Sequence, residues 1–471
     1  MTVTEIATSQ GVDAGHWRER LSTLLGRHKV PGAALGILRD GAITDVAAGL
    51  LSVRTLVDAT PDSLFQIGSI SKVWTTTLIM QLVDEGKLTL DTPVAELITD
   101  FAVVDAEVAS TVTVRHLLTH SSGIDGDVFT DTGRGDDCVQ RYVEKMQEIG
   151  QNHPLGATFS YCNSGFILAG RIVEVLTGKT WDAALRERII EPLGLTATVT
   201  LPEEALLHRA AVGHMGEPGD DPTPAPVWVL PRSAGPAGLI TARVHDVLVF
   251  AATHLAGGVA PNGTRILSAE SAEAMTQWQV DLPDPTTIGD SWGLGWIRFD
   301  WDGHRLVGHD GGTIGQAAFL RLVPGTDFAV ALLTNGGDAR GLYQDLFTEI
   351  FAELAGVTMP AAPAPPENPV EAGDLSSYLG RYSRAGVDTE VYLQDGDLRL
   401  RATTTGPLAA LQDKPDEYEL VAVDTDGAFV MRQEGAPNWT PARFYALTDG
   451  SRYVHYGVRA NPRVDDPAAA R

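Results

Sequence analysis

Apolar residues recur at helical spacing in two places in the first part of the chain. One is the segment 15–28, and the other is the segment 68–86, where Trp74, Leu78 and Leu82 lie three or four positions apart. Residues at this spacing share one face of a helix. The pattern therefore predicts two early helices, each with an apolar face turned toward a core.

Short runs rich in apolar residues, bounded by turn signals, predict strands in two separate regions. Residues 30–49 form two such runs on either side of Asp40-Gly41, a dipeptide typical of tight hairpin turns. Residues 292–335 contain four further runs, with a similar turn at Asp302-Gly303. We expect both regions to pair in one antiparallel sheet, with the helices between them forming a separate layer. This is an α+β arrangement rather than an alternating βα fold.

The long middle of the chain reads mainly as helices. Thr113 and Thr241 each precede a helical pattern and are expected to act as N-caps. The segment 217–236 is rich in proline and glycine, so we expect an irregular loop there. This loop and the segment 125–150 are the places where substrate specificity is expected to lie.

Composition near the C-terminus predicts a second unit. Residues 358–370 are dense in proline and are expected to form a stiff linker after a first domain, 1–357. Residues 371–460 alternate in the manner of strands and predict a small antiparallel barrel. Residues 461–471 are expected to be a loose tail.

Charge and hydrophobicity restrict the kinds of partner. The 471 residues are 44% hydrophobic and carry a formal net charge of −26, which fits a globular protein that binds neither nucleic acid nor an anionic membrane. No apolar run is long enough to span a bilayer, and the N-terminus lacks the pattern of a secretory signal. The two cysteines, Cys138 and Cys162, make no disulfide framework. These features predict a cytoplasmic protein; they do not bear on its oligomeric state.

Ser69 and Lys72 are the first candidates for catalysis. Three positions apart in a helix, they lie on the same face and within reach of each other. A serine hydroxyl becomes a nucleophile when a base takes its proton, and an uncharged lysine can be that base. Neutrality at pH 7 requires a pKa roughly 3 units below the usual ~10.4, or about 4 kcal/mol, which burial or a neighbouring cation can supply.

Two further patches join this pair. Tyr161 and Asn163 stand in ATFSYCNSGF, and the run His309 to Gly312 ends a predicted strand. With RHLLTHSSGI at 115–124, their order and spacing resemble the serine β-lactamase and penicillin-binding-protein superfamily over about residues 15–355. The closer likeness is to its class C β-lactamases, D,D-peptidases, D-aminopeptidases and esterases. The C-terminal unit, through YLGRY and LQDGDLRL, resembles the lipocalin-like domain of some D-aminopeptidases and peptide cyclases.

The resemblance implies a role for each residue. Ser69 would be the acylated nucleophile, with Lys72 and Tyr161 as the proton-transfer groups. Asn163 would orient the lysine and the substrate amide. The backbone N–H groups of Ser69 and Gly312 would form the oxyanion hole, and Gly311 would keep side chains out of the way.

The third patch departs from the family pattern. His309 and Asp310 replace the Lys-Thr of the usual Lys-Thr-Gly. Histidine is charged only near and below its pKa of ~6.5, and a carboxylate at position 310 would repel an anionic substrate. Both changes disfavour a true β-lactamase and favour a D-aminopeptidase, D,D-peptidase or esterase, with His309, Asp310 and Gly311 at the substrate.

No cofactor or metal is expected. His116 and His120 lie one helical turn apart but have no third ligand at matching spacing. Phosphate-loop and dinucleotide motifs are also missing from the sequence.

Three functions remain open from the sequence. The first is a serine acyl-enzyme hydrolase that cleaves an amide or ester of a small molecule or peptide. The second is an acyltransferase or peptide cyclase of natural-product biosynthesis, in which an amine replaces water. The third is a binding protein that keeps the fold without catalysis.

Overall fold

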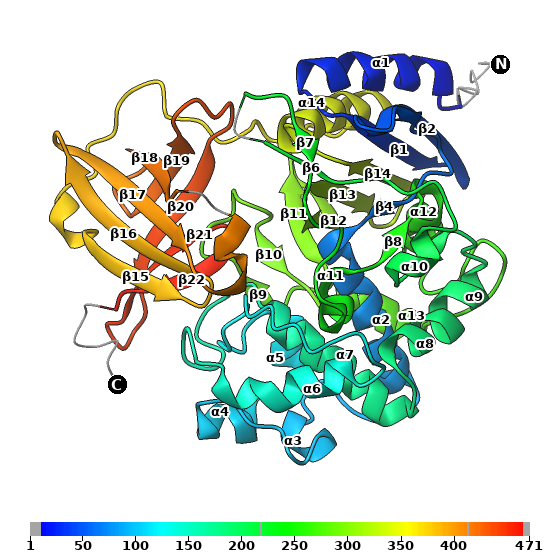
Figure 1. The fold of residues 1–471 in the computed structure, drawn as a ribbon, viewed down its shortest axis with the longest axis horizontal. Coiled ribbons are helices and arrows are strands. Elements are labelled where there is room, and N and C mark those ends of the chain that lie inside the picture. The colour runs from blue at the N-terminus through cyan, green and yellow to red at the C-terminus, as the bar shows by residue number, and fades with distance from the viewer. Residues whose placement is uncertain (1–10, 217–218, 412–413, 465–471) are drawn as a thin grey trace, which may run out of the picture.

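The computed structural model describes residues 11–216, 219–411 and 414–464 (Figure 1). Its largest element is a nine-stranded antiparallel sheet in the order β3-β2-β1-β14-β13-β12-β11-β10-β9. The strands are β1 Gly32–Arg39, β2 Ala42–Ser52, β3 Val57–Asp58, β9 Val280–Asp281, β10 Ser291–Trp292, β11 Ile297–Trp301, β12 His304–Thr313, β13 Gln316–Val323 and β14 Phe328–Thr334. The predicted pairing of the N-terminal hairpin with the later strands is confirmed, through β1 and β14.

The turns of this sheet follow from local backbone chemistry. Both residues of Asp40-Gly41 and both residues of Asp302-Gly303 have a positive φ. A two-residue hairpin turn needs this backbone conformation to match the right-handed twist of the strands that it joins. Both predicted turns are therefore confirmed.

Helices cover both faces of the sheet. Helices α1 (Ala14–Arg27) and α14 (Ala339–Ile350) lie on one face, and α2 (Ser71–Asp84) and α12 (Val244–Leu255) lie on the other (Figure 1). Strand β14 is buried along its whole length, and its alternate residues belong to two different apolar clusters. A strand covered on both faces needs such a continuous apolar run.

The remaining helices form a region beside the sheet, around α2. They are α3 Val94–Leu97, α4 Ala106–Thr111, α5 Val114–Leu118, α6 Cys138–Lys145, α7 Asn163–Thr177, α8 Trp181–Leu185, α9 Glu191–Leu193, α10 Pro202–Ala205, α11 Gly235–Gly238 and α13 Ala269–Thr276. Short 3₁₀ turns, tighter than an α-helix, are η1 Gly68–Ile70, η2 Met146–Glu148 and η4 Arg232–Ala234. Short π turns, wider than an α-helix, are η3 Arg186–Ile190 and η5 Phe351–Ala355. Because α2 is buried from Ser71 to Leu82, its position is fixed by packing on all sides.

Two predictions about this region need correction or refinement. Thr241 does not cap a helix: it lies in strand β8 (Thr241–Ala242), which pairs with β4 (Phe65–Gln66) and β5 (Thr198–Val199), and α12 begins after Arg243. Thr113 caps α5 as predicted, in a reciprocal capping box with His116.

The segment 217–236 is only partly irregular, since it contains β7 (Thr223–Pro224), paired with β6 (His214–Met215), as well as η4 and part of α11. Residues 217–218 of the predicted loop lie outside the described residues.

An eight-stranded antiparallel barrel forms the C-terminal part (Figure 1, yellow to red). Its strands are β15 Gly380–Arg384, β16 Val387–Gln394, β17 Asp397–Thr404, β18 Asp416–Ala422, β19 Ala428–Gln433, β20 Thr440–Ala446, β21 Arg452–Tyr456 and β22 Arg459–Pro462, with η6 Leu375–Ser377 before them and η7 Gly406–Leu411 among them. Tyr382 pairs with Arg463 beyond β22, so the first and last strands meet and the barrel nearly closes. It has an apolar core of its own, which includes Leu400, Phe429 and Val454.

The barrel extends further than predicted. Strand β22 ends at Pro462, and Asn461 is completely buried, so the expected tail cannot begin at residue 461. The rest of that predicted tail, residues 465–471, lies outside the described residues, as do residues 1–10 of the N-terminus considered for a signal. In the described part of the chain, no helix has both the length and the apolar character that crossing a bilayer demands.

Candidate active site

Ser69 and Lys72 lie side by side, as their spacing predicts. Ser69 belongs to the turn η1, directly before α2, and is partly exposed, whereas Lys72 in the first turn of α2 is completely buried. Lys72 Nζ lies 3.1 Å from Ser69 Oγ. A reachable hydroxyl thus contacts an amine that is shielded from water.

Lys72 has three hydrogen-bond partners, and all are uncharged oxygens. Its Nζ lies 2.7 Å from Asn163 Oδ1 and 2.6 Å from the carbonyl oxygen of Ala237, besides the contact with Ser69. Burial lowers the pKa of Lys72 well below its usual value, and the nearby charge of Arg459 lowers it further. Asp127 acts in the opposite direction but does not cancel these effects.

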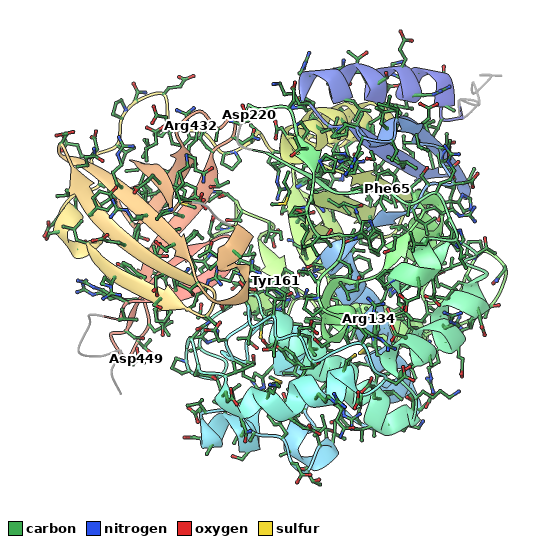
Figure 2. The ribbon with its side chains drawn as sticks, viewed as in Figure 1. Phe65, Arg134, Tyr161, Asp220, Arg432 and Asp449 are labelled. Atoms are coloured by element: carbon green, nitrogen blue, oxygen red, sulfur yellow. The ribbon has the colours of Figure 1, made fainter. Side chains whose placement is uncertain are left out.

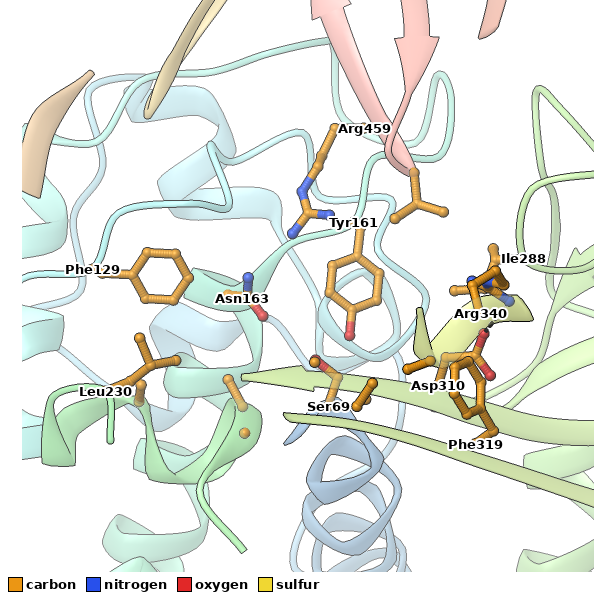
Figure 3. A pocket seen from close by; sticks show the side chains of 18 of the residues that line it. Ser69, Phe129, Tyr161, Asn163, Leu230, Ile288, Asp310, Phe319, Arg340 and Arg459 are labelled. Atoms are coloured by element: carbon orange, nitrogen blue, oxygen red, sulfur yellow. Dashed lines mark hydrogen bonds and ion pairs between the residues drawn. The ribbon is translucent and has the colours of Figure 1, made fainter. Parts of the chain in front are cut away.

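Tyr161 faces the same pair from the other side of the cleft. Figure 3 shows its hydroxyl directed toward Ser69, and Lys72 Nζ lies 4.8 Å from the centre of its ring. The ring stacks on His120 at 4.2 Å between centroids. Burial raises the pKa of Tyr161 above its usual value of 10, so the phenol is protonated at neutral pH.

Asn163 connects Lys72 to a buried carboxylate. At the start of α7, it accepts from Lys72 through Oδ1 and donates through Nδ2 to Asp127 Oδ1, at 2.9 Å. Asp127 in turn binds two arginines of the barrel, Arg384 and Arg459. Asn163 therefore lies between the lysine and a set of charges that the barrel supplies.

Glycines let strand β12 approach the turn that carries Ser69. A Cβ atom on Gly311 would lie 1.9 Å from the carbonyl oxygen of Ile67, and one on Gly68 would lie 2.6 Å from the backbone nitrogen of Gly312. Gly68 also has a φ of +53°, which L side chains rarely adopt. Gly311 thus permits contact between β12 and η1, while a Cβ on Gly312 would meet open space.

The structure changes the expected picture of His309. The residue is completely buried, it is not among the side chains lining the cleft, and its ring packs against Tyr161 and Trp292. Burial lowers the pKa of His309 to about 3, with Lys72 adding to the effect. The ring is therefore uncharged near neutral pH, and the expected contact of His309 with the substrate stays a prediction.

Asp310 lines the cleft, but its charge is balanced. Its carboxylate oxygens lie 2.6 Å from Arg321 Nη1 and 3.2 Å from Arg340 Nη1. Burial raises the pKa of Asp310, but the two arginines outweigh burial and the net shift is downward. Two guanidinium groups accompany the one carboxylate and offset its charge, which weakens the reason for the expected repulsion of an anionic substrate.

His116 of α5 and His120, which follows that helix, both have structural partners. His116 Nδ1 takes part in the capping box with Thr113, and His120 Nδ1 accepts from the backbone N–H of Cys162 at 2.8 Å. Both rings are fixed by contacts within the helical region.

A cleft of about 540 Å³ surrounds Ser69. Figure 3 shows Phe129 and Leu230 on one side of Ser69, and Phe319, Asp310 and Arg340 on the other. The cleft is thus apolar at one end and charged at the other.

The barrel forms part of the cleft wall, which sequence reasoning missed. Val458 and Arg459 line the cleft, and the guanidinium of Arg459 lies 5.0 Å from the centre of the Tyr161 ring. Figure 2 shows Tyr161 at the junction of the barrel and the larger part. Asp127, the partner of Arg459, was also missed as a single residue, although it lies in the predicted specificity segment 125–150. No local pattern marks either residue.

Comparison with known proteins agrees with this geometry. The family model described as beta-lactamase matches residues 17–354, which is more than half of the chain. The chain belongs to the beta-lactamase family. Members of this family and their structural neighbours are serine acyl-enzyme hydrolases, and this protein is an enzyme of that type.

Two curated proteins are similar to this chain in sequence. Penicillin-binding protein 4 of Amycolatopsis lactamdurans is 52% identical over 376 residues, which cover 79% of this chain and 98% of that protein. An unguisins hydrolase of Aspergillus campestris is 28% identical over 332 residues, covering 67% of this chain and 60% of that protein.

A solved structure extends the likeness to the barrel. The crystal structure of SurE superimposes with a TM-score of 0.75 at 29% identity, covering 96% of this chain and 100% of SurE. The combination of a beta-lactamase-family part with a C-terminal barrel is therefore shared with a protein of known structure.

Proposed function

We propose that this protein cleaves an amide or ester bond through an acyl-enzyme on Ser69, with Lys72 and Tyr161 transferring protons. The observation that carries the proposal is the buried amine of Lys72, 3.1 Å from a hydroxyl that lines the cleft. Because the pKa of Lys72 is lowered, the amine is available in its uncharged form.

The contacts of Lys72 indicate how the nucleophile would be activated. An uncharged amine has two N–H groups and one lone pair. The N–H groups fit the two short contacts, to Asn163 Oδ1 and to the carbonyl of Ala237. The lone pair then faces Ser69 Oγ and accepts its proton as the oxygen attacks the substrate carbonyl.

The tetrahedral intermediate would be stabilised by backbone donors. The N–H groups of Ser69 and Gly312 lie on the two elements that Gly68 and Gly311 bring into contact. An oxyanion donor of this kind typically contributes about 2.7–4 kcal/mol to transition-state stabilisation.

Tyr161 is suited to protonate the leaving group. It is a neutral phenol directed toward Ser69 (Figure 3), and it recovers a proton from Lys72 once the amine or alcohol has left. A water molecule then attacks the acyl group, with the same residues working in reverse to release the acid and restore Ser69.

The cleft and the relatives together support a proposed substrate class. The apolar end, with Phe129 and Leu230, suits an apolar side chain beside the scissile carbonyl. A penicillin-binding protein and an unguisins hydrolase are among the similar proteins, which supports a hydrolase acting on molecules of this size class. We place this chain with D-aminopeptidase-like and esterase-like hydrolases, acting on small molecules or peptides.

Acyl transfer to an amine is the second candidate. SurE, which matches this chain over both parts, has also been crystallised with D-Leu, a molecule that carries a free amine and a carboxylate. If an amine replaced water at the acyl-enzyme, the same residues would form a new amide. The presence of the barrel in both proteins favours testing this reaction.

Substrate turnover separates the two reactions. The full chain would be incubated with D-aminoacyl amides, p-nitrophenyl esters and acyl thioesters, each with and without added D-Leu. Free acid in both conditions supports hydrolysis, and a D-Leu amide product supports transfer. No turnover of any substrate, or equal turnover by Ser69→Ala, contradicts the proposal.

A further inference from the structure

Asp127 is buried in a position that joins the barrel to the candidate active site. Its carboxylate lies 2.6 Å from Arg384 Nη1, 2.8 Å from Arg459 Nε and 2.9 Å from Asn163 Nδ2. Burial raises the pKa of Asp127, but the two arginines outweigh burial and lower it to about 2. Asp127 is therefore ionised throughout the neutral range.

An ionised carboxylate restricts the orientation of its amide neighbour. A carboxylate only accepts hydrogen bonds, whereas an amide has a donating end and an accepting end. The NH₂ of Asn163 must therefore face Asp127, and its oxygen is left to face Lys72, 2.7 Å away. The opposite orientation would point an NH₂ group at Lys72, where it would compete with Ser69 for the lone pair of the amine.

The barrel supplies both cations through elements that are fixed against the larger part. Arg459 begins β22 and Arg384 ends β15. The β21–β22 turn, Gly457-Val458, has positive φ at both residues, and the Val458 carbonyl accepts from the backbone N–H of Tyr161 at 3.0 Å. A β-branched residue at a φ of +62° is strained, and such strain persists where surrounding contacts hold it.

We propose that Asp127 is a positioning residue for the acyl-enzyme reaction: its carboxylate, held by Arg384 and Arg459 of the barrel, fixes Asn163 so that the amide oxygen faces Lys72. The inference rests on the proposed function of Ser69 and Lys72. It gives the barrel a direct part in catalysis, because the active arrangement of Asn163 depends on charges that only the docked barrel provides.

Replacement of one carboxylate oxygen by an amide nitrogen tests this directly. In Asp127→Asn, the single remaining oxygen is drawn to the arginines, and the new NH₂ group faces Asn163 and favours its flipped orientation. We expect the rate of Ser69 labelling by a fluorophosphonate to fall at least tenfold. Asp127 also raises the pKa of Lys72, so its replacement by asparagine lowers that pKa. The acid limb of the pH profile, where labelling slows because Lys72 becomes protonated, therefore moves to lower pH. That shift reports the lost charge, whereas the labelling rate on the plateau above the limb, where Lys72 is uncharged, reports the orientation of Asn163.

Asp125→Asn is the matched control. Asp125 also contacts the barrel, where its Oδ2 accepts from the backbone N–H of Ala385 at 2.5 Å, but it has no contact with Asn163 or Lys72 among the hydrogen bonds of the described residues. We expect labelling within twofold of the parent protein and an unchanged acid limb.

A charge-matched double variant covers the case in which Asp127→Asn does not fold. Asp127→Asn with Arg384→Met removes one negative and one positive charge, so the cluster keeps its net charge while the acceptor-only carboxylate is lost. The same tenfold loss is expected. If a folded Asp127 variant labels as fast as the parent on the plateau of the pH profile, the inference is overturned. Failure of the proposed function is recognised separately, because Ser69→Ala would then label as fast as the parent.

Discussion

The guanidinium of Arg459 lies 5.0 Å from the centre of the Tyr161 ring, although the two residues belong to different parts of the chain. The arginine is partly buried, and its guanidinium contacts Asp127 and the carbonyl oxygen of Gly457 beside the Tyr161 ring. A cation from the barrel is thus part of the electrostatic environment of Lys72.

The first prediction concerns this cation. Arg459→Met removes a charge that lowers the pKa of Lys72, so the pKa of Lys72 rises toward its usual value. Because the uncharged amine is the base, the acid limb of kcat/KM moves to higher pH. A pH profile of ester hydrolysis measures the shift.

Arg384→Met is the control for that experiment. Arg384 also binds Asp127, but it is not among the groups that shift the pKa of Lys72. The acid limb of the kcat/KM profile of Arg384→Met should therefore stay closer to that of the parent than the acid limb of Arg459→Met does. Equal shifts in both variants would show that docking of the barrel, rather than the charge of Arg459, sets the profile.

Lys72→Met separates activity from stability. The substitution keeps most of the side-chain volume and removes a buried amine, so the melting temperature should stay the same or rise. Loss of the proton-transfer group should lower kcat/KM by about 10²–10⁴-fold. Activity retained within tenfold would contradict the role of Lys72.

Gly311 and Gly312 of β12 should respond differently to alanine. A Cβ on Gly311 would collide with the backbone of Ile67 at 1.9 Å, whereas one on Gly312 has no atom within 4 Å. Gly311→Ala should therefore lower the melting temperature and displace Ser69, with activity reduced by about 10²-fold or more. Gly312→Ala should melt like the parent, and a similar loss of stability in both would refute the close approach of β12 and η1.

Acid should destabilise the protein through its buried histidines. Burial lowers the pKa of His254 to about 3, below the ~6.5 of an unfolded chain, so the unfolded state binds more protons. The stability this provides is present above pH ~6.5 and is lost as the pH falls toward 3. Through His254 alone, the free energy of unfolding falls by about 2 kcal/mol between pH 7 and pH 5. Urea unfolding of His254→Phe should show a pH dependence weaker by that amount.

The fold could be predicted where local chemistry decides it. Asp40-Gly41 and Asp302-Gly303 specify tight turns by themselves, and the strands beside them are short runs bounded by these turns. Thr241 was assigned wrongly because its pairing partners in β4 and β5 are distant in sequence, and tertiary pairing outweighed its preference for an N-cap.

The site could be predicted only in part, for the same reason. Ser69 and Lys72 share a helix face, so their contact follows from spacing alone. The contribution of Arg459 depends on how the barrel docks, which no local pattern encodes, and the burial of His309 depends on packing by Tyr161 and Trp292. The linker at 358–370 as a domain boundary and a cytoplasmic location remain predictions.

Intact mass of the protein after treatment with a fluorophosphonate or a penicillin tests the acyl-enzyme at its origin. We expect one covalent adduct per chain, located at Ser69 by peptide mapping and missing from Ser69→Ala. An adduct on another residue, an equal adduct on Ser69→Ala, or an unmodified parent protein with both reagents would contradict the assignment of Ser69 as the nucleophile.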